Sequence, residues 1–215
     1  MLRSTVLPAL LGILAGTCGR HVETPLAAAA ARGDRNALNS LVQAGKVNAP
    51  DSRGCTALIA AARAGQVESI QTLVRLGADP DLRGGGNDWT PIMHAIHKFR
   101  HRAVTALLDA GADPNFRTRS GLTALTMAAG YGDARMVRLL LSHGANPRDG
   151  RALAAAVSGV ADIDKFTLGD CQTETVHALL DAAPDLRLPN TAHGRWARRL
   201  ASWGGCAEVV QAVRP

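Results

Sequence analysis

The fold of this chain is decided by the stretch Asp51-Ser-Arg-Gly-Cys-Thr-Ala-Leu-Ile-Ala-Ala-Ala-Arg-Ala-Gly65, which continues into Val67-Glu-Ser-Ile-Gln-Thr-Leu-Val-Arg-Leu-Gly-Ala-Asp-Pro80. Thr56 is placed to cap the start of a helix, because its hydroxyl can accept a hydrogen bond from a backbone N–H of the first turn. Gly65 interrupts this helix, and Gly77 is placed to end a second one. The stretch therefore predicts two short helices joined by a tight turn.

Both predicted helices have one apolar face. Residues spaced three or four apart lie on the same side of a helix, and these apolar positions are Leu58, Ala61 and Ala62 in the first helix and Ile70, Leu73 and Val74 in the second. Two such helices cannot bury both faces by themselves, so copies of the pair must stack on one another.

The same pattern recurs four times along the chain. The head threonines are Thr24, Thr56, Thr90 and Thr123, and the tail glycines are Gly45, Gly77, Gly111 and Gly144. The head-to-tail spacings 45−24, 77−56, 111−90 and 144−123 all equal 21 residues, whereas the steps between heads are 32, 34 and 33. The variation in length thus falls in the connectors, which tolerate insertions better than packed helices do.

These segments resemble the ankyrin repeat, and Gly121 through Pro147 matches it as well as the opening stretch does. The resemblance covers roughly residues 20 to 215. It implies an all-α solenoid of five to six ankyrin repeats, in which helix-turn-helix pairs are joined by β-hairpin-like fingers. The expected repeats are 20–50, 51–83, 84–116, 117–149, 150–189 with an insertion at 159–172, and a C-terminal cap at 190–215.

The last repeats depart from the pattern. The insertion 159–172 is interpreted either as a functional loop or as neutral drift. The charged residues Arg195, Arg198 and Arg199 fit a polar C-terminal cap, and the alternative is a basic docking patch. In the third repeat, Phe99 replaces the glycine between the helices, which is expected to change that turn.

Residues 1–17 have the features of an export signal, namely Arg3, an apolar run from Val6 to Ala15 and small residues after it. The predicted repeat domain is then 18–215, in the periplasm or outside the cell. A less favoured possibility is a lipid anchor at Cys18. The alternative is an N-terminal capping helix in a cytoplasmic adaptor.

No catalytic or cofactor-binding motif is present in the sequence, so we expect a protein that is not an enzyme and has no cofactor or small-molecule substrate. His94, His97 and His101 have spacings that would suit a metal on one helix. The repeat register instead puts a turn at Phe99, which separates His101 from the other two. No metal site is therefore predicted, and a metal-binding or enzymatic protein using His94, His97 and the insertion is the less favoured alternative.

Two of the four cysteines, Cys171 and Cys206, fall at the same helix–helix turn of neighbouring repeats. Export would make a disulfide between them possible, although the repeat spacing is near the limit of its reach.

The resemblance also implies a partner-binding surface, made by the fingers and the exposed ends of the first helices. By register, its residues are Arg32, Arg53, Arg63, Trp89, His97, Lys98, Arg119, Leu122 and Tyr131. Tryptophan, tyrosine and arginine are common anchors of interfaces. The alternative is that Trp89 packs on a neighbouring finger and that the arginines are only solvated.

Composition favours an acidic protein partner. The chain has 24 basic and 18 acidic residues, a net charge of +6 and a sequence pI near 9.8. Nucleic acid is not expected, because no nucleic-acid-binding motif accompanies the arginines. We therefore expect a monomeric protein-interaction module, whose family resemblance suggests modulation or inhibition of a partner enzyme or toxin.

Overall fold

The computed structural model describes residues 24–42, 46–148, 151–159, 172–188 and 192–203, together with residues 209 and 211. These ranges contain eleven helices and no strand longer than the single bridge between Gly84 and Trp89. The helices are α1 (Pro25–Arg32), α2 (Arg35–Leu41), α3 (Ala57–Ala64), α4 (Val67–Arg75), α5 (Pro91–His97), α6 (His101–Asp109), α7 (Ala124–Gly130), α8 (Ala134–Ser142), α9 (Ala152–Ser158), α10 (Thr173–Ala182) and α11 (Ala192–Trp203).

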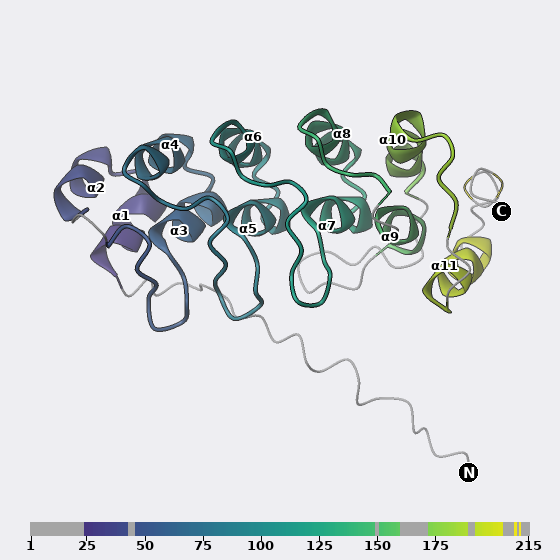
Figure 1. The fold of residues 1–215 in the computed structure, drawn as a ribbon, viewed down its shortest axis with the longest axis horizontal. Helices are drawn as coiled ribbons and strands as arrows, with labels where there is room; N and C mark the ends of the chain where they lie inside the picture. The colour runs from purple at the N-terminus through teal and green to yellow at the C-terminus, as the bar shows by residue number, and fades with distance from the viewer. Residues whose placement is uncertain are drawn as a thin grey trace, which may run out of the picture.

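The helices stack in two parallel rows (Figure 1). One row holds the first helix of each pair, and there α1, α3, α5, α7, α9 and α11 pack in sequence order. The other row holds α2, α4, α6, α8 and α10. The connectors after α2, α4 and α6 extend below the first-helix row as fingers. The predicted all-α solenoid is therefore confirmed.

The head threonines begin the first helices. The hydroxyl of Thr24 accepts a hydrogen bond from Ala27 N at 3.2 Å, and Thr56 accepts one from Ile59 N at 3.3 Å. Thr123 caps α7 in the same way. Thr90 occupies the equivalent position before α5, but its side chain makes no capping bond. The cap position was thus predictable from sequence, whereas the capping bond itself was not formed at every repeat.

The turns between paired helices use a left-handed residue, with φ of 78° at Gly33, 81° at Gly65 and 70° at Gly132. Phe99 takes the same place in the third repeat with φ 55°. The prediction that Phe99 changes this turn is therefore wrong, since the backbone keeps the left-handed conformation. The side chain is held by packing on its neighbours, which offsets the unfavourable conformation of a residue with a Cβ.

The core lies between the rows and is built from small and aliphatic side chains. In α3, every residue from Ala57 to Ala62 is buried, and Leu73 of α4 and Ile92 of α5 are fully inaccessible. Alanine on the first helices lets neighbouring repeats approach closely, and each buried leucine or isoleucine contributes roughly 1.5–3 kcal/mol. The stack therefore holds together with few aromatic residues.

Several predicted features lie outside the described residues. They are the export signal 1–17, Cys18, Cys171, Cys206 and the interior of the insertion, of which only the ends Gly159 and Gln172 are described. In the predicted cap, α11 packs on α9, and Arg198 donates to Leu188 O at 3.4 Å. Over the ranges given above, no helix has the length and apolar character needed to cross a membrane.

Candidate functional site

The nine predicted partner-binding residues lie on the fingers and at the ends of the first helices. Arg53, Trp89, Arg119 and Leu122 are on fingers, whereas Arg32, Arg63, His97, Lys98 and Tyr131 are at or next to the C-terminal ends of α1, α3, α5 and α7. Arg32 and Arg119 are exposed, Tyr131 is buried and the other six are half-buried. The structure thus gives these residues different accessibility.

A row of rings connects the third and fourth repeats. The rings of Trp89 and His97 pack at an angle of 60° with centroids 5.2 Å apart, and His97 Nδ1 lies 2.8 Å from the hydroxyl of Tyr131. The ring of Phe99 lies 5.4 Å from that of Tyr131. Aromatic pairs at these separations are mutually stabilising. We call Trp89, His97, Phe99 and Tyr131 the aromatic row.

Tyr131 is a correction to the predicted surface. Its side chain is only 3% exposed, because it is covered within the aromatic row and hydrogen-bonds His97. It therefore supports the surface from beneath. Trp89 packs against the core and against the His94 and His97 rings of α5 in its own repeat. Phe99 was missed as a member of this group, and the signal that could have found it is an aromatic residue at a glycine position.

The three histidines have separate protein contacts. His94 is fully buried on α5, and its Nε2 lies 3.3 Å from Gly84 O. His97 contacts Tyr131, whereas His101 begins α6 and pairs with Asp133 at 2.8 Å. The predicted separation of His101 from the other two is thus seen. Among the residues that the structure describes, no three His, Cys, Asp or Glu side chains are grouped to hold a metal.

His94 is held as a neutral side chain. Burial in the repeat core, reinforced by the positive charge of Arg63, lowers the pKa of His94 to about 3. The fit is close, because a Cβ placed on Gly85 would lie 3.0 Å from the His94 ring. His94 therefore holds the finger after α4 against α5 and does not act as an acid at neutral pH.

The acidic side chains Asp51 and Asp88 form hydrogen bonds or ion pairs with other residues of the fingers. Asp51 is buried and accepts hydrogen bonds from the backbone N–H groups of Arg53 and Cys55 at 2.9 and 2.8 Å. Asp88 accepts from Arg119 N at 3.0 Å and forms an ion pair with Arg83 at 3.1 Å. The backbone N–H of Arg119, together with Arg83, holds the pKa of Asp88 below its usual value. The guanidinium of Arg119 itself remains exposed.

Cys55 occupies the same finger position as Trp89 and Leu122. It is 1% exposed and disulfide-bonded. Its burial separates it from the half-buried Trp89 and Leu122 at the equivalent positions. The other three cysteines of the chain, Cys18, Cys171 and Cys206, lie outside the described residues.

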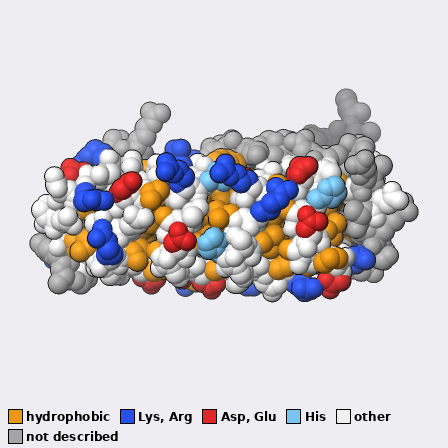
Figure 2. Space-filling model, turned by 90° about the horizontal axis from the view of Figure 1, so that it is seen from above, with side chains coloured by type: hydrophobic (Ala, Val, Ile, Leu, Met, Phe, Trp, Pro, Cys, Tyr) orange, Lys and Arg blue, Asp and Glu red, His pale blue; other side chains and the backbone are white. Residues whose placement is uncertain are grey.

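The opposite face of the stack has a mixed character. Figure 2 shows the face formed by the second helices, where basic and acidic side chains alternate with apolar patches. Arg102 of α6 and Arg138 of α8 are exposed there, as is Glu174 of α10, which pairs with Arg138 at 3.3 Å. Asp109 at the end of α6 likewise pairs with His143 at 3.6 Å, so acidic and basic side chains are balanced on this face.

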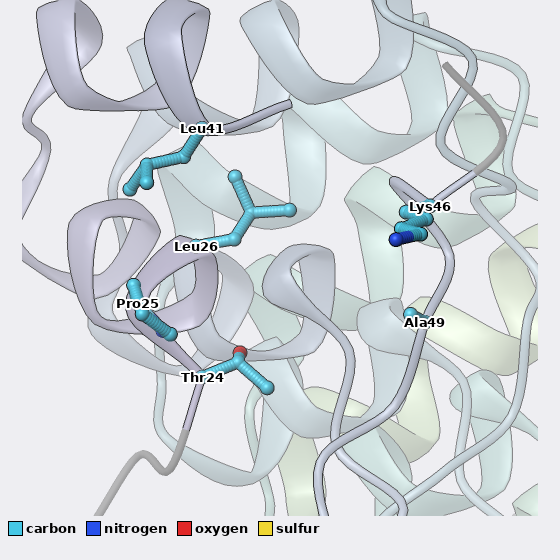
Figure 3. A pocket seen from close by; sticks show the side chains of 6 residues that line it. All are labelled: Thr24, Pro25, Leu26, Leu41, Lys46 and Ala49. Carbon is cyan, nitrogen blue, oxygen red and sulfur yellow. The ribbon is translucent and has the colours of Figure 1, made fainter. Parts of the chain in front are cut away.

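A hollow lies at the N-terminal end of the described stack (Figure 3). Its walls come from the start of α1, the end of α2 and the following connector, and the lining residues are Thr24, Pro25, Leu26, Leu41, Lys46 and Ala49. Leu41 is 41% exposed. The hollow is apolar because, within the described residues, α1 packs on α2 and α3 with no further repeat on its other side.

Known proteins share this architecture. The family profile of ankyrin repeats, built as three copies, matches residues 5–84 and 92–190. The chain is 37% identical over 113 residues to an ankyrin repeat-containing protein of Treponema pallidum (strain Nichols), covering 53% of this chain and 38% of that protein. It is 42% identical over 93 residues to SH3 and multiple ankyrin repeat domains protein 1 of Homo sapiens, covering 42% of this chain and 4% of that protein. It therefore corresponds to less than half of each of these two relatives.

The structural comparison covers more of the chain. The crystal structure of an ankyrin repeat domain from Acinetobacter baumannii AYE superposes with a TM-score of 0.72 at 27% identity, covering 88% of this chain and 95% of that one. The repeated helix pairs, the sequence profile and this superposition agree, and the chain belongs to the ankyrin-repeat family.

Proposed function

We propose that this chain binds an acidic surface of a partner protein through its fingers and first-helix ends, without catalysing a reaction. Ankyrin repeats are in general protein–protein interaction modules. The observation that carries the finer proposal is the charge arrangement of the fingers. Asp51 accepts hydrogen bonds from backbone N–H groups of its finger, and Asp88 accepts one from Arg119 N and pairs with Arg83. The side chain of Arg119, in contrast, is exposed.

The aromatic row supports the same surface by making it rigid. Because His97 is held between Trp89 and Tyr131, the adjoining end of α5 has little freedom to lose on binding. A preorganised surface binds more tightly, since less side-chain entropy is lost. Arg32 and Arg119, at the two ends of this side, would supply charge-assisted hydrogen bonds to carboxylates of the partner.

The proposed consequence of binding is modulation or inhibition of a partner enzyme or toxin in the periplasm or outside the cell. Two features support export. Residues 1–17 have the pattern of a signal peptide, and Cys55 is disulfide-bonded, which is typical of proteins that mature under oxidising conditions. A cytoplasmic adaptor is the competing proposal, and N-terminal sequencing of natively produced protein that begins at Met1 would contradict export.

The surface can be tested by site-specific crosslinking in the native host. A photoreactive residue at position 119 should capture the partner, whereas the same residue at exposed position 102, on the opposite face, should not. Once the partner is identified, Arg32→Ala with Arg119→Ala should weaken its binding by about tenfold or more, since each lost charged contact costs roughly 1 kcal/mol. Arg102→Ala is the matched control. Capture from position 102 alone would place the site on the second helices.

A further inference from the structure

Cys55 is disulfide-bonded and buried just before Thr56, the residue that caps α3. Its partner must be one of Cys18, Cys171 and Cys206, which are the other cysteines of the chain. A disulfide requires Cα atoms within about 7 Å of each other. The described helices fix how closely each candidate can approach Cys55.

Cys206 is too far along the stack. It follows the end of α11 by three residues (206−203), and α11 packs on α9. From α3 to α11 there are four first-helix steps, through α5, α7 and α9, each about 8–10 Å. Three extended residues cover only about 10 Å, so Cys206 cannot reach Cys55.

Cys171 is also excluded, because its described neighbour Gln172 lies two repeats away from Cys55. It precedes Gln172, whose side chain covers Gly132 in the turn after α7. That turn is two repeats from Cys55 along the first-helix row, since α5 lies between α3 and α7. The separation is on the order of 20 Å from the helix spacing alone. One peptide unit and one side chain do not span it.

Cys18 remains, and it has the required reach. It precedes Thr24, the cap of α1, by six residues (24−18). Thr24 and Thr56 cap the same end of α1 and α3, and these helices pack directly on each other, so the two residues are about 10 Å apart. Six residues extend up to about 20 Å. We propose that Cys18 and Cys55 form a disulfide that ties the segment before the first repeat to the second repeat.

The pairing has a chemical consequence for the N-terminus. Each thiol gives up one proton and one electron as the S–S bond forms, and the electron pair reduces a disulfide oxidant of the compartment to a dithiol. The sulfur of Cys18 is then consumed and cannot carry the thioether of a lipid anchor. A processed chain that begins at or before Cys18 retains the disulfide.

Peptide mapping without reduction tests the pairing. The full chain is produced with its own N-terminus, recovered from an oxidising periplasm and digested with trypsin. The expected product is a linked pair, made of the peptide ending at Arg20 and the peptide Gly54–Arg63, that separates on reduction. An alkylated Cys55, its linkage to the peptide of Cys171 or Cys206, or a lipid on Cys18 would each overturn the proposal.

Two variants provide a second readout. Cys18→Ser should add one reactive thiol per chain under denaturing conditions and lower the Tm by about 10 °C, the scale expected for opening a loop of this length. Cys206→Ser should leave the Gly54–Arg63 peptide linked as before. If Cys18→Ser adds no thiol while Cys206→Ser adds one, the pairing is wrong.

Discussion

At residue 99, a phenylalanine occupies a backbone conformation that glycine occupies in the first, second and fourth repeats. Its φ of 55° costs about 1 kcal/mol for a residue with a Cβ. The ring nevertheless packs on Tyr131. We expect Phe99→Gly to be more stable than Phe99→Ala by about 1 kcal/mol in urea unfolding, because both lose the ring and only glycine relieves the backbone.

The neighbouring residue is the control for this comparison. Lys98 has φ of −97°, an ordinary value, so glycine there should be no more stable than alanine. If glycine is favoured equally at positions 98 and 99, the backbone at Phe99 is not the source of the difference.

A buried neutral histidine should make the fold sensitive to acid. The unfolded chain binds a proton at His94 near pH 6.5, whereas the folded chain resists it down to about pH 3. The stability that depends on neutral His94 is therefore complete above pH 6.5 and is lost as the pH falls toward 3, by about 1.4 kcal/mol per unit. His94→Met, which introduces the residue found at the equivalent position 127, should flatten this dependence.

Urea unfolding at pH 7 and pH 5 checks the expectation for His94. His177→Gln, at an exposed position on α10, is the control and should keep the dependence of the native chain. An unchanged pH dependence in His94→Met would show that other groups are responsible.

At the scale of the elements, side-chain amides join the ends of the second helices in successive repeats. Asn48 donates to Gly77 O and accepts from Asp79 N, at 3.2 and 2.9 Å. Asn115 makes the same pair of bonds, with Gly144 O and Asn146 N. At the equivalent position between them, Asp81 only accepts from Asp113 N. A carboxylate has no donor for the carbonyl of Gly111.

Asp81→Asn should therefore stabilise the stack by about 1 kcal/mol at pH 7. Burial, together with the charges of Asp113 and Asp79, raises the pKa of Asp81 above 3.8 despite the bond from Asp113 N. Below pH 3.8 the carboxyl of Asp81 is protonated in both the folded and the unfolded chain, and its charge then costs no stability. As the pH rises through the raised pKa of the folded chain, the carboxyl ionises and the destabilisation by Asp81 develops fully. The gain from Asp81→Asn should shrink accordingly at pH 3.5.

The control for Asp81→Asn is Asp181→Asn on α10, which changes the net charge equally at an exposed position. Thermal unfolding of both variants at pH 7 and pH 3.5 distinguishes them. Equal stabilisation by the two variants would assign the effect to net charge and not to the connection between repeats.

At the scale of the whole molecule, the proposed partner surface predicts a dependence on salt. Binding through exposed arginines should weaken several-fold between 50 and 300 mM salt, because ions screen interactions between exposed charges. The double variant Arg32→Ala, Arg119→Ala should show a shallower dependence than the native chain. Isothermal titration with the captured partner measures this, and a salt dependence that the variant leaves unaltered would locate the charged contact elsewhere.

The sequence by itself determined the solenoid, because a 21-residue body repeated four times, with caps at its ends, is a local pattern that only stacking can satisfy. It also determined that His101 starts a separate helix. Tertiary structure decided how accessible the residues of the predicted surface are. Tyr131 is buried because His97 and Phe99 of the preceding repeat cover it, and Cys55 is buried with its sulfur in a disulfide. Such contacts join residues that are distant in sequence, so repeat register alone could not supply them.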